Sequence, residues 1–429
     1  MVIKDVLKRL LPESYRGFLR KHFHFLHVAH FTYNVITYNR RLNKKIQCVR
    51  AKDEINIMFY IFNIAMWKSD KLVELLQQDK RYKVYIVPFL SETDTEQYNK
   101  NNNESILNYF RGKGIEVREG FDFEHNRRYP VDSYDADIIF YPQPYIIDIE
   151  QLPHRALMAY IPYCYIMEDM SVFHNTLFQN ICWRMYYPTQ MHKEMEEKYA
   201  FNKAKNVVVV GYSMADYFFE ESKVSDSMWK SSDRAFKRVI WAPHHSILDD
   251  DPLDYSNFLE IADDMLALAN AYKDKLQFVF KPHPRLKAKL YQHPKWGEAR
   301  TDAYYDSWAK NPNCSMIEGN YVDLFKSSDC MIHDCSSFTG EYLYVNKPVM
   351  FVTKKETIEQ FNVFAQECLK MHYRGGCIDD IKRFLDDVIQ GIDPMLKQRT
   401  AFLNSVLRTN SSNSVAMTIY KDICETFVS

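Results

Sequence analysis

The stretch that decides the fold reads Cys330-Met331-Ile332-His333-Asp334-Cys335-Ser336-Ser337-Phe338-Thr339-Gly340-Glu341. Its apolar start, Cys330–Ile332, predicts a buried strand, and the polar residues that follow predict a turn that opens a helix. Hydroxyls and backbone N–H groups at a helix N-terminus bind anions without a glycine-rich loop. An ordinary helix cap would explain one serine, but not Asp334, Ser336 and Ser337 together.

Two further apolar runs end in histidines. Arg238–Trp241 leads into Ala242-Pro243-His244-His245-Ser246, and Leu276–Phe280 leads into Lys281-Pro282-His283-Pro284-Arg285. The prolines restrict the loop around His283, and Lys281 and Arg285 make a positive patch suited to a diphosphate. A purely structural histidine in a proline-rich turn is the alternative.

These runs belong to a longer alternation of strands and helices. The strands we predict are Ile55–Ile61, Tyr82–Leu90, Ile115–Val117, Asp137–Tyr141, Leu157–Tyr163 and Val207–Val210, then Arg238–Trp241, Leu276–Phe280, Cys314–Ile317, Cys330–Ile332 and Pro348–Val352. Helix-compatible stretches such as Lys71–Gln78, Glu104–Arg111 and Tyr255–Tyr272 lie between them. This pattern predicts an α/β chain with two Rossmann-like domains, at 51–235 and 236–429, facing each other across a cleft. The charged, serine-rich stretch Glu220–Arg234 has the composition of a linker between the domains.

Composition narrows the class of protein. The chain has 429 residues, of which 46% are hydrophobic and 26% charged, as in a globular protein. Its nine cysteines are odd in number and contain no CxxC pair, so we expect neither a disulfide framework nor a zinc site. With no long apolar run and no signal-peptide pattern, we expect a cytoplasmic protein.

The first 52 residues carry an excess of positive charge. They hold twelve Lys and Arg residues against Asp5 and Glu13, a balance of 12 − 2 = +10, interleaved with Leu and Phe. This composition predicts a basic amphipathic helical arm over residues 1–50 that binds an anionic membrane surface, on the inner face of the cell membrane, and not nucleic acid. The alternative is a basic helix packed on its own protein.

Taken together, the motifs resemble the CDP-glycerol glycerophosphotransferases that build teichoic-acid polymers. The matching residues, in order, are Gly211-Tyr212 with Asp216, Ala242-Pro243, His283-Pro284, Ser328-Asp329 through Ser336-Ser337, Glu341 and Lys347-Pro348. The resemblance implies a GT-B fold, CDP-glycerol as co-substrate with no other cofactor and no metal, and a peripheral membrane location. It also implies that His283, Ser336 and Ser337 hold the donor diphosphate, with Glu341 near the nucleotide.

One departure concerns the general base. Where the family commonly has Trp-His-Gly, this chain reads Tyr160-Ile161-Pro162-Tyr163-Cys164-Tyr165, without the histidine. Other residues near that loop or facing it are candidates for the base: His154, Glu168, Asp169, His174, His244 and His245. We rank His245 and Asp169 first, because both follow strands and so reach the cleft, whereas His154 precedes its strand. Asp169 as a helix cap is the alternative.

The expected reaction is attack by an acceptor hydroxyl on the β-phosphorus of CDP-glycerol, with release of CMP and transfer of glycerol phosphate or a related polyol phosphate. We expect His283 as a cation, Lys281, Arg285 and the helix N-terminus to stabilise the developing charge, and Asp334 to belong to the donor site. The acceptor can be a lipid-linked glycan, a capsular repeat or a polyol-phosphate chain. The alternatives are a GT-B glycosyltransferase that uses a nucleotide sugar and a non-catalytic nucleotide- or polymer-binding module.

Overall fold

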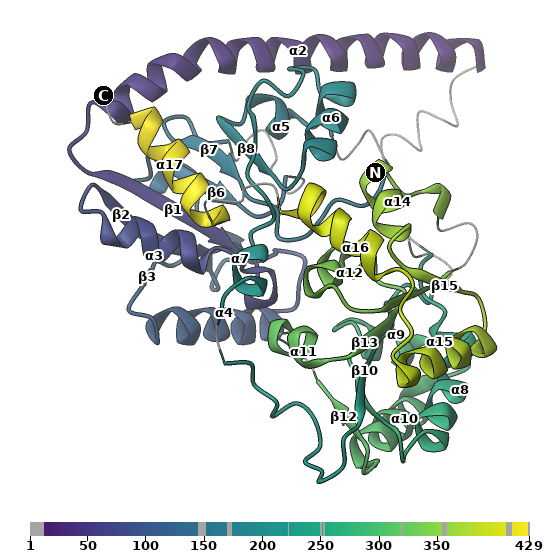
Figure 1. The fold of residues 1–429 in the computed structure, drawn as a ribbon. Helices are drawn as coiled ribbons and strands as arrows, with labels where there is room; N and C mark the ends of the chain where they lie inside the picture. The colour runs from purple at the N-terminus through teal and green to yellow at the C-terminus, as the bar shows by residue number, and fades with distance from the viewer. Residues whose placement is uncertain are drawn as a thin grey trace.

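In the computed structural model, seven parallel strands form the first sheet (Figure 1), in the order β3-β2-β1-β6-β7-β8-β9. Their bounds are β1 Ile55–Ile61, β2 Tyr82–Pro88, β3 Glu116–Val117, β6 Ile138–Tyr141, β7 Leu157–Tyr160, β8 Arg184–Tyr187 and β9 Val207–Val209. The helical segments of this part are η1 Ile64–Met66, α3 Asp70–Gln78, α4 Glu96–Arg111, η2 Val131–Ser133, α5 Leu177–Ile181, α6 Gln190–Tyr199 and α7 Ala215–Phe218. The chain reverses its direction of strand addition between β1 and β6, which makes this pair the switch point of the sheet.

Six parallel strands form the second sheet, in the order β12-β11-β10-β13-β14-β15. Their bounds are β10 Lys237–Ala242, β11 Leu276–Phe280, β12 Cys314–Met316, β13 Cys330–His333, β14 Val349–Val352 and β15 Tyr373–Gly375. Helical segments cover both faces: α8 Phe258–Ala271, α9 Leu286–Gln292, α10 Gly297–Lys310, α11 Val322–Ser327, α12 Ser336–Glu341, η5 Tyr342–Val345, α14 Val363–Leu369, α15 Ile378–Gln390, α16 Leu396–Phe402 and η6 Leu403–Leu407. The switch point here lies between β10 and β13, whose carboxyl ends carry the predicted histidine and serine loops.

The structure describes residues 13–144, 152–169, 174–221, 223–248, 251, 254–317, 319, 321–353, 358–408 and 414–427, with side chains from residue 29 onward. Within these ranges every predicted strand is present, and the two Rossmann-like sheets are confirmed. The sequence prediction missed β8, β15 and the small hairpin of β4 Phe121–Asp122 and β5 Arg127–Arg128. These segments are two to four residues long, and three of them contain arginines, so they lack the apolar run that marks a buried strand.

The last helix corrects the expectation that the second domain keeps all of the C-terminal helices. Helix α17, Val415–Phe427, returns to the first domain and lies beside α3 (yellow in Figure 1). The carboxylate of Asp216 accepts the N–H groups of Val415 and Ala416 at 2.7 and 2.9 Å, which caps the helix. Arg184 donates to Asp422 at 2.9 Å. The Asp216 of the family motif is therefore a structural cap.

The basic arm forms one long helix, α2, Glu13–Arg50. Its C-terminal part packs on the first domain: Val35 is buried, Tyr38 donates to the carbonyl of Pro153 at 2.9 Å, and Lys45 contacts the carbonyl of Ala156 at 3.2 Å. For this C-terminal part of α2, the alternative of a basic helix packed on its own protein is correct. Lys45 contributes to that packing and is not available to a membrane surface. Residues 1–12 of the predicted arm lie outside the described residues. No helix in the described part of the chain is long and apolar enough to cross a membrane.

Candidate donor site at the edge of the second sheet

Three imidazole rings meet where β10 and β11 end. The centroid of the His245 ring lies 4.3 Å from that of the His244 ring and 4.2 Å from that of the His283 ring. The centroids of the His244 and His283 rings are 5.3 Å apart. Strands β10 and β11 are paired, with Trp241 opposite Phe280, so their loops leave the sheet side by side. The N–H of His283 donates to the carbonyl of Pro243 at 3.1 Å and ties the two loops together.

The backbone fixes which ring nitrogen carries the proton. Nδ1 of His283 accepts the N–H of Arg285 at 3.1 Å, and Nδ1 of His244 accepts the N–H of Ser246 at 3.2 Å. In a neutral ring the proton is then on Nε2, which becomes a hydrogen-bond donor. Burial, helped by His245 and neighbouring cations, lowers the pKa of His283 to about 3. The expectation of a cationic His283 is therefore wrong for the free protein: at neutral pH it offers a neutral N–H donor.

His245 differs from its two neighbours. Its Nδ1 is buried and has no hydrogen-bond partner among the described residues. Burial, with Lys289 and Arg285 nearby, lowers the pKa of His245 to about 4. At neutral pH this imidazole is therefore uncharged and has an unused ring nitrogen at the edge of the sheet.

Asp334 holds the histidine loop in place. Its two carboxylate oxygens accept the N–H of His244 at 2.5 Å and the N–H of Asn257 at 2.7 Å. The side chain is buried. A carboxylate that is occupied by two backbone amides and would repel a diphosphate is a positioning group, so Asp334 is not the donor ligand that we expected.

Positive charge surrounds the three rings. Lys281 is buried, with its ammonium group 5.7 Å from the centroid of the Tyr321 ring, and Arg285 is exposed at the rim. Lys289, which the sequence reasoning missed, lies one turn further along α9 and pairs with Asp251. The only sequence signal for it was its spacing of four residues from Arg285, which places both on one face of a helix.

The serines of the opening stretch begin α12 at the neighbouring strand end. Ser336 and Ser337 are half-buried, and their side chains have no hydrogen-bond partner within the described ranges. The cap position, Cys335, supplies no side-chain hydrogen bond to the helix. Because β10 pairs with β13, with Ala242 opposite His333, these free hydroxyls and amides lie at the same edge as the histidines.

The histidines also suggest a metal site, because one ligand atom from each lies within 4.8 Å of the others. A metal ion needs a free lone pair on each ligating nitrogen. In the neutral rings of His244 and His283 the lone pair of Nδ1 accepts a backbone N–H and Nε2 carries a proton. With Arg285 and Lys289 adding positive charge beside His245, the cluster favours an anion.

Glu341 does not lie where a nucleotide could reach it. The side chain is 2% exposed and sits between the domains, where the hydroxyl of Tyr212 donates to its Oε1 at 2.7 Å. Burial raises the pKa of Glu341, and the charge of Lys68 opposes that shift. The expected contact with the nucleotide is therefore replaced by an interdomain contact, and the Gly-Tyr motif supplies its partner.

Among the other base candidates, Glu168 is linked to the histidines through Tyr255, whose ring centroid lies 5.3 Å from that of His244. Asp169 is exposed and accepts the hydroxyl of Tyr199 at 2.6 Å, and the residues that it was expected to cap, 170–173, lie outside the described residues. Glu168 accepts the hydroxyl of Tyr255 at 2.8 Å. His154 contacts Asp132 and His174 contacts Glu196, each within the first domain. Of the ranked pair, His245 belongs to the histidine cluster.

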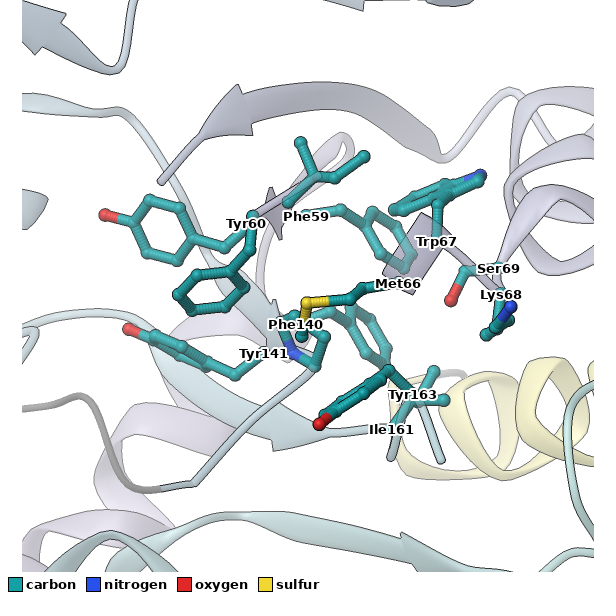
Figure 2. A pocket seen from close by; sticks show the side chains of 13 residues that line it. Phe59, Tyr60, Met66, Trp67, Lys68, Ser69, Phe140, Tyr141, Ile161 and Tyr163 are labelled. Atoms are coloured by element: carbon teal, nitrogen blue, oxygen red, sulfur yellow. The ribbon is translucent and has the colours of Figure 1, made fainter. Parts of the chain in front are cut away.

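The first sheet has a different carboxyl edge, which Figure 2 shows from close by. A cavity of about 20 Å³ lies above β1, β6 and β7, and aromatic side chains make most of its wall. Lys68 and Ser69 close it at the start of α3. The ammonium group of Lys68 lies 5.2 Å from the Tyr321 ring centroid, the same ring that Lys281 approaches from the second domain. The two edges therefore meet at Tyr321.

Comparison with known proteins identifies a matching family and solved structures with a similar fold. A model of the family "CDP-Glycerol:Poly(glycerophosphate) glycerophosphotransferase" matches residues 183–413. A structure of the wall teichoic acid polymerase TagF has a TM-score of 0.58 at 14% identity, over 94% of this chain and 98% of that one. A UDP-GlcNAc 2-epimerase from Neisseria meningitidis, bound to UDP-GlcNAc, has a TM-score of 0.53 at 13% identity, over 87% and 99%. These likenesses show a shared GT-B fold. No curated protein sequence matches the chain.

Proposed function

The chain belongs to the CDP-glycerol:poly(glycerophosphate) glycerophosphotransferase family, and we propose that it binds the diphosphate of CDP-glycerol at the edge of the second sheet. The observation that carries this assignment is the convergence of three histidines, Lys281 and the hydroxyls of Ser336 and Ser337 on one strand edge. Most of these groups are hydrogen-bond donors or cations. A diphosphate, which is rich in acceptors and negative charge, is the complementary ligand.

The reaction forms one bond and breaks one. An oxygen of the acceptor hydroxyl bonds to the β-phosphorus of CDP-glycerol, and the bond from that phosphorus to the bridging oxygen breaks, which releases CMP. The Nε2–H of His283 and the ammonium of Lys281 are placed to stabilise charge on the departing phosphate. His245, whose imidazole is uncharged at neutral pH, is the residue that we propose as acceptor of the hydroxyl proton.

A donor panel tests this proposal. The purified full chain is incubated with a polyol-phosphate acceptor and, in turn, CDP-glycerol, CDP-ribitol, and UDP- and GDP-sugars, with and without a metal chelator. We expect CMP release with CDP-glycerol only, and no effect of the chelator. Release of UDP or GDP from a sugar nucleotide would identify a GT-B glycosyltransferase, and binding of nucleotides without turnover would identify a non-catalytic module.

We further propose that the acceptor is a cell-surface glycan or a polyol-phosphate polymer and that the protein acts at the inner face of the cell membrane. The support is the charge of the arm, since twelve basic residues lie in the first 52. Deleting residues 1–28 should abolish sedimentation with vesicles that contain anionic lipid, and high salt should weaken binding of the intact chain. Vesicles of neutral lipid are the control, and an intact chain that ignores anionic vesicles at low salt contradicts the proposal.

A further inference from the structure

The start of α3 lies at the switch point of the first sheet, where ligands bind in open α/β sheets. The helix has nine residues, and its cap residue, Ser69, makes no side-chain hydrogen bond to the helix. Ser69 lines the cavity above β1 and β6, so its free hydroxyl lies in the cavity wall at the start of α3 (Figure 2). A helix N-terminus alone is a common feature. This one differs because Lys68, the residue before Ser69, also lines the cavity.

Lys68 is a cation with no hydrogen bond or close ion pair among the described residues. Part of the side chain remains exposed, but the protein encloses the ammonium end closely enough that burial lowers the pKa of Lys68. Glu341 opposes this shift from a distance, and the ring of Tyr321 lies 5.2 Å away. An enclosed charge without a close partner is costly, and binding an anion repays that cost.

The acidic residue next to this cation is already occupied. Asp70 accepts the indole N–H of Trp67 at 2.8 Å and the hydroxyl of Tyr109 at 2.6 Å, and it pairs with Lys113 at 2.9 Å. Its charge is therefore balanced by Lys113. An incoming anion meets one free ammonium group, one free hydroxyl and the positive end of a helix.

We propose that Lys68, Ser69 and the first turn of α3 form an anion site that holds the phosphate of the acceptor next to its reacting hydroxyl. This inference rests on the proposed function, because it assumes that CDP-glycerol binds at the opposite edge. The cavity of about 20 Å³ has room for about one water molecule, so the acceptor chain stays outside and only its end group reaches Lys68. Lys68 thereby positions the acceptor and makes or breaks no bond.

Substitutions of Lys68 separate this role from others. Lys68→Met removes the charge, and Lys68→Arg keeps the charge but cannot act as a base. For Lys68→Met we expect the KM for a short oligo(glycerol phosphate) acceptor to rise about 10- to 100-fold, the range for a lost hydrogen bond to a charged group. Its KM for CDP-glycerol and its KM for a neutral acceptor, glycerol, should show no matching change. Lys68→Arg should retain most of the affinity for the phosphate-bearing acceptor.

The controls make the inference independent of a folding defect. Lys80→Met removes an exposed lysine just beyond the other end of the same helix and should match the wild type. Thermal unfolding of Lys68→Met should occur at or above the wild-type temperature, because an enclosed unpaired charge is removed; a purely structural lysine would lower it.

Three outcomes overturn the inference: an unchanged KM for the oligo(glycerol phosphate), an equal loss with both acceptors, or a loss in Lys68→Arg that is as large as in Lys68→Met. Binding of the oligo(glycerol phosphate) to the wild type and to Lys68→Met, measured by calorimetry without donor, gives a second reading. If the wild type does not turn over CDP-glycerol, the proposed function fails, but the calorimetric comparison still tests the anion site.

Discussion

The carboxyl edges of the two sheets use positive charge in opposite ways. The second sheet gathers Lys281, Arg285 and Lys289 around three histidines, and burial, helped by these cations, keeps the rings neutral. The first sheet presents a single enclosed cation, Lys68, in an aromatic wall. Crowded charge suits a ligand with two phosphates, whereas one ammonium group suits one phosphate. This difference is the one expected if the second sheet binds the donor and the first sheet binds the acceptor, as we propose.

The two edges are also physically connected. The rings and carboxylates between them form a continuous contact: Tyr321 lies near both Lys68 and Lys281, and Glu341 joins the second domain to Tyr212 of the first. Gly340 allows this approach, because a Cβ there would lie 2.8 Å from the Tyr165 ring. The effects of substitutions at the two edges can therefore be compared with each other and with the effect of a substitution in the interface between them.

The largest effect should come from the donor edge. His283→Ala removes an Nε2–H donor that meets developing charge, and we expect kcat to fall by about 10²- to 10³-fold or more. The double substitution Ser336→Ala with Ser337→Ala should weaken donor binding as well. CMP release and calorimetry with CDP measure the two effects, and His125→Ala, an exposed histidine of the first domain, is the control. Normal turnover and donor affinity in His283→Ala would show that His283 is not part of the donor site. Loss of donor affinity in Lys68→Met instead would show that the donor binds at the first sheet.

A second effect concerns the proton of the acceptor hydroxyl. Because the pKa of His245 in the free protein is about 4, this residue is already neutral at pH 5, and kcat/KM should not fall between pH 8 and pH 5 on its account. His245→Gln should lower the rate by about 10²-fold, the typical gain from general-base catalysis, while CDP still binds.

The pH profile can also contradict the proposed role of His245 as the general base. A wild-type profile with an acidic limb centred near 6.5, the ordinary pKa of histidine, would assign the proton transfer to a group without the burial of His245. A His245→Gln variant with normal turnover would show that the substrate or another residue takes the proton.

How far the sequence predicts this site depends on how local the signal is. The loops after β10, β11 and β13 were predictable, because each is a short apolar run followed at once by proline, histidine or serine. That the three loops lie at one edge follows from the rule that parallel strands share their carboxyl ends. These parts of the fold and the site can be predicted from residues that are neighbours in the sequence, together with the rule on parallel strands.

The remaining features depend on contacts between distant residues. Glu341 is buried because Tyr212, 129 positions earlier, bonds to it, and α17 crosses to the first domain because Asp216 caps it from 199 positions away. Lys68 is a lone lysine in a loop, with no pattern around it. Its significance lies in the absence of a close partner and the presence of Tyr321, neither of which the sequence displays.

The smallest effect should come from the interface between the edges. Tyr212→Phe removes a hydroxyl that lies 2.7 Å from Oε1 of Glu341 in a buried site, and we expect a loss of about 1–3 kcal/mol in the free energy of unfolding. Burial raises the pKa of Glu341 in the folded state, so the stability that comes from its protonated form is present at low pH and is lost as pH rises through that pKa. The Tyr212 hydroxyl stabilises the ionised form, so the loss in Tyr212→Phe should be larger at pH 8 than at pH 5. Urea unfolding at the two pH values measures this, with Tyr272→Phe, whose hydroxyl donates to Asp386 on the surface, as the matched control. A loss that is independent of pH, or equal to that of the control, would mean that Glu341 does not depend on Tyr212 and that the two edges are joined elsewhere.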